Sequence, residues 1–254
     1  MGVGNHPYFI VLRREDEGVT TLYFIRHGQA GPPDDYDRLS PLGERQASLL
    51  GAYFAAREIS FETLLAGGLK RQQETARLVA AELASSSREV TTDERWNEFS
   101  LLQVYRELAL RLREDSPEFA RDLEEMTSAV KLDPHTTRGA AGRCDRAVIE
   151  AWMENRYPDA TSETWDDFRG RVRSAWESLA GREPDERIAI FTSATPIAIG
   201  VGMSLSLSHQ GILRLMAVLF NSSLTVIKLR QGEPLLISFN MTPHLHEPSM
   251  VTYR

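Results

Sequence analysis

Cysteine, long apolar runs and repeated segments are what this sequence lacks. Cys144 is the single cysteine among 254 residues, which excludes an intramolecular disulfide and a cysteine metal cluster. No apolar run reaches the ~18 residues that a membrane-spanning helix requires. There is no internal repeat and no low-complexity segment. These absences favour a globular domain in a reducing compartment, and we expect a cytoplasmic protein without a membrane partner.

The sequence also has fewer basic than acidic residues. Lysine and arginine number 29 against 36 acidic residues, so the formal net charge is -7. This balance argues against a nucleic-acid partner held by general electrostatics. It is compatible with an anionic substrate, provided that the binding site is made positive locally.

The N-terminal stretch, residues 1–16, has a short apolar patch with no basic region before it. A secretory signal peptide places a basic region ahead of its apolar segment. His6 stands where a myristoylation signal has serine or threonine. We therefore interpret this stretch as a mature N-terminus without a targeting signal.

Apolar runs that favour strands alternate with stretches that favour helices. The expected strands are 21–25, 61–67, 187–193, 224–229 and 234–240. Ser40 followed by Pro41 predicts a helix start, and a second helix is expected over 69–84. Interleaved strands and helices predict an α/β fold, a three-layer αβα sandwich with a mostly parallel central sheet.

The section from about 99 to 185 is helical, charged and poor in strands. Its clearest helix, 162–181, places an apolar stripe on one face, made of Trp165, Phe168, Val172, Ala175 and Leu179. The stretch 135–145 is the best candidate for a loop. We expect a single domain over 1–254, with 99–185 as a helical cap insertion.

Three expected strands end in residues suited to binding an anion. The first runs directly into Arg26 and His27, and the second leads into a helix whose first turn carries Lys70 and Arg71. The third ends at 191–196, again before a helical stretch. In open α/β sheets, ligands bind beyond the carboxyl ends of the strands and at helix starts. The sequence therefore predicts a phosphate site at this edge of the sheet.

Arginine and histidine supply complementary chemistry there. Guanidinium groups match phosphate oxygens two at a time. A neutral imidazole nitrogen can attack phosphorus and form a phosphohistidine, while the other ring nitrogen donates a hydrogen bond that holds the tautomer. Gly28 allows the backbone to approach a ligand closely.

Five stretches, in this order along the chain, resemble the histidine phosphatase superfamily, also called the phosphoglycerate mutase-like family. They are FIRHGQA (24–30), LSPLGERQA (39–47), LKRQQETA (69–76), WNEF (96–99) and SFNMTPHL (238–245). The Arg-His-Gly motif alone is only moderately specific, whereas the ordered set is strongly indicative. The stretches cover most of the chain.

The resemblance implies a role for each matching residue. His27 matches the nucleophile that becomes phosphorylated, and Arg26 and Arg71 match the phosphate-binding arginines. Glu98 matches the general acid and base, which protonates the leaving alcohol and then activates water. Gln29 stands where the family often has a polar contact to the substrate. Charged neighbours around Glu98 leave a plain surface carboxylate as its alternative.

One position departs from the family pattern. The family's second histidine usually lies in a Ser-His-Gly sequence after the last buried strand, and here Ser193-Ala194-Thr195 stands in that place. Losing one such electrostatic donor typically costs about 10²–10³ in rate. The backbone N–H groups and the Thr195 hydroxyl remain candidates to bind the anion. His209 and His244 are the candidate replacement imidazoles.

The expected function is hydrolysis of a phosphate monoester through a phosphohistidine, with neither a metal nor another cofactor. The expected partner is a small phosphorylated substrate or a phosphoprotein. Arg138 or Arg143 would meet an acidic leaving group. The first alternative, motivated by Ala194, is a catalytically impaired module that binds phosphate or a phosphoprotein. The second is a phosphotransferase of the phosphoglycerate mutase type. The pair His244-x-His246 lacks the further ligands of a metal site.

Overall fold

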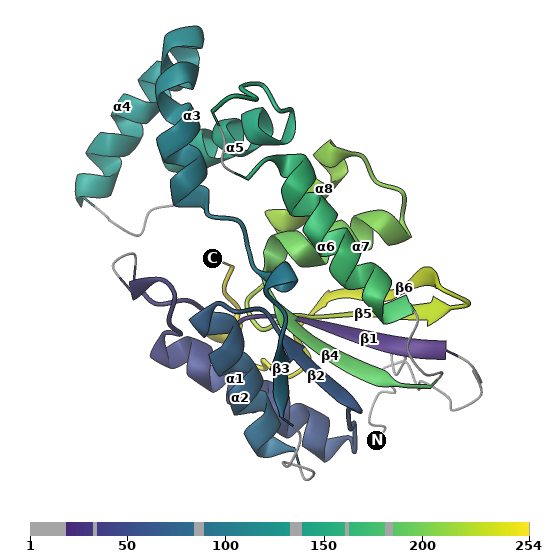
Figure 1. Ribbon diagram of the computed structural model, residues 1–254. Helices are drawn as coiled ribbons and strands as arrows, with labels where there is room; N and C mark the ends of the chain where they lie inside the picture. Colours follow the sequence, from purple (N-terminus) through teal and green to yellow (C-terminus); the bar gives the residue numbers. More distant parts are fainter. Residues whose placement is uncertain are drawn as a thin grey trace, which may run out of the picture.

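The computed structural model has a six-stranded sheet at its centre (Figure 1). It describes residues 19–32, 35–83, 89–132, 139–160, 163–180 and 185–253. The interpreted N-terminal stretch and Arg138 lie outside these residues. In sequence order the strands are β1 (Val19–Arg26), β2 (Thr63–Ala66), β3 (Val90–Thr92), β4 (Arg187–Thr192), β5 (Leu224–Arg230) and β6 (Glu233–Met241).

The strand order across the sheet is β3-β2-β4-β1-β5-β6. The pairs β3–β2, β2–β4 and β4–β1 are parallel, whereas β5 runs antiparallel to both β1 and β6. The predicted α/β class with a mostly parallel sheet is therefore confirmed. The three expected site segments follow β1, β2 and β4, which are neighbours in the sheet.

Both faces of β1 are buried, as its uninterrupted apolar run predicted. Leu22 and Phe24 belong to the core on one face, and Tyr23 and Ile25 belong to the core on the other. The alternation follows from the two-residue period of a strand. Side chains just beyond the strand are consequently fixed by packing on two sides.

Helices α1 (Pro41–Ala56) and α2 (Lys70–Glu82) cover one face of the sheet (Figure 1). Ser40 caps α1, with its hydroxyl accepting from the backbone N–H of Gly43 at 3.0 Å, and Pro41 is the first helical residue. Both features were predicted from the sequence. The start of α1 lies against the chain that leaves β1, since the Gln29 carbonyl accepts from the Ser40 N–H at 2.9 Å.

The other face carries α6 (Trp165–Ala180), α7 (Ala194–Ser204) and α8 (His209–Met216) (Figure 1). Helices α3 (Leu101–Asp115), α4 (Pro117–Leu132) and α5 (Ala140–Met153) extend away from the sheet beside them. The expected insertion, 99–185, thus contains three helices that project from the sheet and one, α6, that lies over it. Short 3₁₀ turns occur at η2 (Glu94–Trp96) and η3 (Pro248–Met250).

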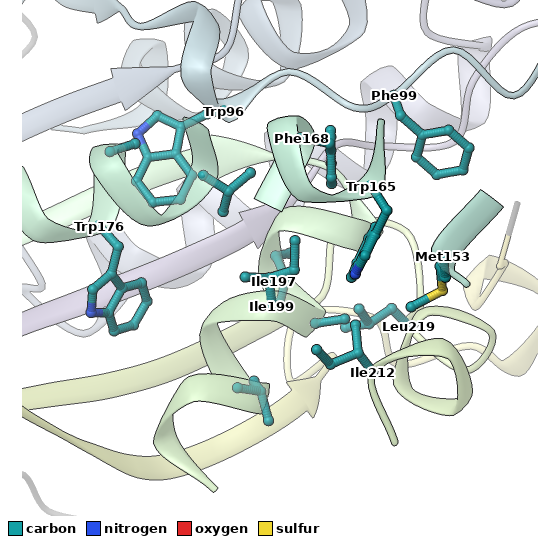
Figure 2. Close-up of a cluster of buried hydrophobic side chains, with 14 of the residues drawn as sticks. Trp96, Phe99, Met153, Trp165, Phe168, Trp176, Ile197, Ile199, Ile212 and Leu219 are labelled. Carbon is teal, nitrogen blue, oxygen red and sulfur yellow. The ribbon is translucent and has the colours of Figure 1, made fainter. Parts of the chain in front are cut away.

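The core between α6 and the sheet is rich in aromatic residues (Figure 2). The predicted stripe on α6 is buried along its whole length, from Trp165 to Leu179. Trp176 stacks on Phe24 of β1, with ring centroids 5.2 Å apart. Phe99 stacks on Trp152 of α5 at 4.6 Å, which ties the projecting helices to the segment that carries Glu98.

Two local predictions were wrong. The described part of the loop candidate 135–145 is mostly helical, because α5 begins at Ala140, directly after Gly139 with its positive φ of 63°. Cys144, which lies in a polar stretch of sequence, is completely buried on α5. Strand β3 was missed because three residues are too short to show an alternating pattern. Among the described residues, no helix is long and apolar enough to cross a membrane.

Candidate active site

The site is built where three neighbouring strands end. Strand β1 ends at Arg26, β2 leads through Gly67 and Gly68 into α2, and β4 leads through Ser193 into α7. Because β4 lies between β1 and β2, the starts of α2 and α7 lie close to the residues that leave β1. Two helix N-termini at the carboxyl ends of these strands favour the binding of an anion.

His27 is buried and held from several sides. Its backbone N–H donates to the Thr192 carbonyl at 2.9 Å. Its Nε2 accepts from Nε of Arg71 at 3.2 Å, and its Nδ1 lies 2.7 Å from the Gly28 carbonyl oxygen. Since Arg71 can only donate, Nδ1 carries the ring proton and donates to Gly28. The lone pair of Nε2 therefore faces the arginine side of the site.

The imidazole is neutral at neutral pH. Burial is the largest cause that lowers the pKa of His27 well below its ordinary value, and the positive charges of Arg71 and Arg26 lower it further. A neutral ring retains the lone pair that a nucleophile needs. The environment that makes His27 a poor base also makes it available for attack.

The two arginines are buried beside it. Arg26 donates from NH1 to the Leu219 carbonyl, and its buried Nε has no hydrogen-bond partner among the residues that the structure describes. Arg71 donates from NH1 to the Asp37 carboxylate at 2.9 Å. Unpaired buried donors are costly, so the free Nε of Arg26 fits a site that receives an anion.

Glu98 lies at the start of α7. Its Oε2 accepts from the backbone N–H of Thr195 at 3.1 Å, and its Oε1 accepts from the N–H of Phe99 at 3.2 Å. The carboxylate is half-buried, and its charge acts to raise the pKa of Arg26 against the lowering effect of burial. Glu98 thus lies near Arg26. It also contacts Thr195, although 97 positions in the sequence separate these two residues.

The other two predicted phosphate contacts, Gln29 and Thr195, form hydrogen bonds to other residues of the protein. The side-chain oxygen of Gln29 accepts from the Ser40 hydroxyl at 2.7 Å, so that atom holds the start of α1. Thr195 is buried and gives its N–H to Glu98. Ala194 is the first residue of α7 and is half-buried. Ala194 therefore places a methyl side chain, which has no hydrogen-bond donor, at the start of α7.

The candidate replacement imidazoles lie in different surroundings. His209 is exposed, and its Nε2 lies 2.9 Å from NH1 of Arg169 on α6. His244 is buried, with its Nε2 2.8 Å from the Ser222 hydroxyl. Ser222 in turn donates its N–H to the His27 carbonyl at 3.1 Å. His244 is thus linked through Ser222 to the backbone of His27, whereas His209 pairs with Arg169 of α6.

Arg143, expected beside an acidic leaving group, is engaged elsewhere. Its guanidinium pairs with Asp122 at 2.7 Å and with Glu125 at 3.0 Å, both on α4. Within the described residues, no group of three or more histidine, cysteine, aspartate or glutamate side chains is placed to hold a metal ion. Burial raises the pKa of the Cys144 thiol to about 11, and no role in the site follows for it.

Sequence reasoning missed Asp37 and Thr75. Asp37 accepts from Arg71 and, at 3.3 Å, from the backbone N–H of Lys70. Thr75 accepts at 3.1 Å from the N–H of Gly28 and so supports the backbone next to the nucleophile. Thr75 falls inside a quoted family stretch, whereas Asp37 had no signal beyond its place between two such stretches.

A family model described as histidine phosphatase superfamily (branch 1) matches residues 22–150 and 107–242. These two overlapping stretches cover most of the chain and contain every predicted site residue. The chain belongs to the histidine phosphatase superfamily. The resemblance inferred from the five motifs is therefore confirmed.

A curated relative of the chain is the broad-specificity phosphatase YOR283W of Saccharomyces cerevisiae. It is 34% identical over 82 residues, and the match spans 29% of this chain and 34% of that protein. The chain thus matches about a third of that relative's length.

Solved structures share the fold at low identity. A phosphoglycerate mutase from Bacillus anthracis has a TM-score of 0.59 at 19% identity, covering 91% of this chain and 97% of that one. A phosphoserine phosphatase mutant from Entamoeba histolytica, in complex with phosphoserine, has a TM-score of 0.57 at 17% identity, covering 89% of this chain and 99% of that one. These likenesses show that the histidine phosphatase fold extends over nearly the whole chain.

Proposed function

We propose that this superfamily member hydrolyses phosphate monoesters through a phosphohistidine on His27. The observation that carries the proposal is the geometry at Nε2 of His27, whose lone pair accepts a hydrogen bond from the buried guanidinium of Arg71 at 3.2 Å. A nucleophile beside a cationic phosphate clamp suits attack on an anionic ester. The partial match to a curated phosphatase supports the same reaction type.

In the first half of the reaction, Nε2 of His27 attacks phosphorus and the bond from phosphorus to the ester oxygen breaks. Arg71 releases its hydrogen bond to Nε2 and, with Arg26, binds the phosphate oxygens. Protonated Glu98 gives its proton to the departing alkoxide, so an alcohol leaves. The Nδ1 proton stays on His27 and remains bonded to the Gly28 carbonyl.

In the second half, Glu98 takes a proton from water as the water oxygen attacks the phosphorus of phosphohistidine. The bond between phosphorus and Nε2 breaks, which returns His27 to its neutral form and releases inorganic phosphate. Glu98 ends with a proton taken from water, which replaces the one that left with the alcohol. General acid–base catalysis of this kind contributes typically about 10²–10⁴ in rate.

The charge of the transferred phosphoryl group is balanced here by protein donors. Arg26 and Arg71 supply the donors, and the positive dipole ends of α2 and α7 add to the favourable field. Gln29 and Thr195 are proposed as additional polar contacts to the phosphate. On this basis the reaction needs no metal or other cofactor, and turnover should persist in a chelator.

A second candidate function rests on Ala194. A methyl group at the first position of α7 offers no donor to the developing charge. A chain with this site would bind phosphate, or a phosphoprotein, with little turnover. Mutase activity ranks below both, because it requires a phosphohistidine that resists water.

The two candidates are separated by incubating the protein with p-nitrophenyl phosphate and EDTA, then measuring released phosphate and acid-labile protein phosphate. The proposal expects both in the wild type and neither in His27→Ala. His246→Ala is the matched control, since His246 is an exposed histidine to which no role in the phosphate site is assigned. Turnover in His27→Ala overturns the mechanism. Phosphate binding with no label and no turnover in the wild type favours the binding module.

A further inference from the structure

Two arginines connect the segment that carries Glu98 to helix α6. Arg171, on α6, donates from NH1 to the carbonyl oxygens of Arg95 at 2.9 Å and Asn97 at 2.8 Å. Arg95 reaches in the opposite direction, donating to the hydroxyls of Ser174 at 3.1 Å and Ser178 at 3.3 Å. Only Arg171 binds the carbonyl of the peptide unit that enters Glu98.

The segment is anchored at both ends by buried aromatic residues. Trp96 is completely buried, and its carbonyl accepts from the Thr192 hydroxyl at 2.6 Å, which fixes it to the end of β4. Phe99 packs on Trp152 of the projecting helix α5. It also packs on Phe168 of α6 (Figure 2). Asn97 and Glu98 lie between these two anchors and connect the sheet to the projecting helices.

Arg171 is itself held rigidly. Its Nε donates to Glu163 at 2.6 Å, its NH2 reaches the other Glu163 oxygen at 3.3 Å, and its guanidinium carbon lies 4.3 Å from the centre of the Phe168 ring. The planar guanidinium uses one edge for the carboxylate and leaves NH1 for two carbonyls. A lysine ammonium lacks this fork and cannot satisfy both sets of acceptors in the same geometry.

We propose that Arg171 is a positioning residue that sets the backbone of Glu98 and so aims its carboxyl group at the leaving oxygen. The proposal rests on the proposed function, in which Glu98 is the general acid. Removing Arg171 leaves the carbonyls of Arg95 and Asn97 without their shared donor. The N–H of Asn97 still donates to the Glu94 carbonyl at 2.9 Å, but the carbonyl side of the peptide that leads into Glu98 is loosened. Proton transfer from Glu98 then suffers, while the phosphate clamp of Arg26 and Arg71 is untouched.

The test compares Arg171→Met with Arg95→Met on a series of aryl and alkyl phosphates that differ in leaving-group pKa. A good leaving group such as p-nitrophenolate needs little protonation, whereas an alkoxide needs it fully. Arg171→Met should lower kcat/KM, which reports the steps up to formation of phosphohistidine, by about 10-fold or more on alkyl phosphates and by less than about 3-fold on p-nitrophenyl phosphate. Arg95→Met, which also cuts contacts to α6, should leave the leaving-group dependence as in the wild type.

Two further variants keep the result interpretable. Glu163→Gln weakens the hydrogen bonds that hold Arg171. The rate should then depend more steeply on leaving-group pKa than in the wild type, but less steeply than in Arg171→Met. Arg171→Lys should rescue only part of the loss. Equal losses of kcat/KM on all substrates in Arg171→Met, or equal leaving-group slopes of kcat/KM in Arg171→Met and Arg95→Met, would overturn the proposal.

A readout independent of turnover separates this proposal from the proposed function. Amide hydrogen exchange over Asn97–Phe99 should accelerate in Arg171→Met and not in Arg95→Met. Unchanged exchange in Arg171→Met overturns the positioning role even if the wild type is an active phosphatase. A wild type without turnover, or Glu98→Gln with full activity on alkyl phosphates, overturns the proposed function instead.

Discussion

Nε of Arg71 donates to Nε2 of His27 across 3.2 Å, although 44 positions separate the two residues in the chain. This contact fixes the tautomer of the imidazole and places a phosphate-binding group on the nucleophilic atom. It also means that Arg71 exchanges a nitrogen partner for phosphate oxygens when a substrate enters. The other partners of Arg71 therefore influence how readily an anion binds.

Asp37 is the partner that competes most directly with an anion. Its carboxylate takes a hydrogen bond from Arg71 and one from the first turn of α2. We expect Asp37→Asn to bind inorganic phosphate several-fold more tightly, measured by calorimetric titration, because a competing negative charge is removed. Asp35→Asn is the matched control, since Asp35 pairs with exposed Arg38. Weaker binding in Asp37→Asn would contradict competition.

Ala194 offers a gain-of-function test. A histidine at the first position of α7 would add a donor beside the helix start, next to the N–H that contacts Glu98. Because losing one such donor costs about 10²–10³ in other enzymes, we expect Ala194→His to raise kcat by roughly 10- to 100-fold. Steady-state kinetics with Ala194→Leu, which adds bulk without a donor, provides the comparison. Equal kcat in the two variants would refute an electrostatic role for this position.

Gly43 is required by the close approach of α1 to the residues after the nucleophile. A Cβ on Gly43 would lie far inside van der Waals contact with the Gln29 carbonyl oxygen, which is backbone and cannot rotate away. We expect Gly43→Ala to lower the free energy of unfolding by about 1–3 kcal/mol in urea titrations. Gly170→Ala on α6 meets no atom within 4 Å and should be neutral or stabilising. Equal stability of Gly43→Ala and the wild type would show that the backbone can shift.

Because His244 is buried, we expect the free energy of unfolding to fall at acid pH. Burial is the main cause that lowers its pKa to about 4, below the ordinary value of roughly 6.5 that applies to the unfolded chain. The unfolded state therefore binds more protons between these two values, and the free energy of unfolding falls as the pH drops through that range. The loss attributable to His244 is on the order of 3 kcal/mol.

Urea titrations of the wild type and His244→Gln from pH 8 to pH 4 measure this dependence. The variant should lose less stability between these limits, relative to its own value at pH 8, where the histidine of the wild type is neutral. Some loss remains, because the lowered pKa of His27 acts in the same direction. Parallel curves for the two proteins would show that His244 does not carry the effect.

The local sequence was informative where short-range patterns decide structure. The apolar run 21–25, the Ser40-Pro41 start and the stripe from Trp165 to Leu179 each predicted an element that the structure contains. Residues 140–145 were misread because polar neighbours obscured the helical spacing of Ala140, Cys144 and Val148, all of which are buried. Only the packing of α5 against the other cap helices reveals that face.

By itself, the sequence determined the family, the adjacency of Arg26 and His27, and the α/β class, because these depend on neighbouring residues and ordered motifs. The tertiary structure alone decided that Glu98 meets Thr195, that Asp37 occupies Arg71 and that Arg171 holds the peptide before Glu98. These contacts join residues 97, 34 and 74 positions apart. No local propensity encodes such distances; they arise when three strand ends and two helix starts are packed at one edge of the sheet.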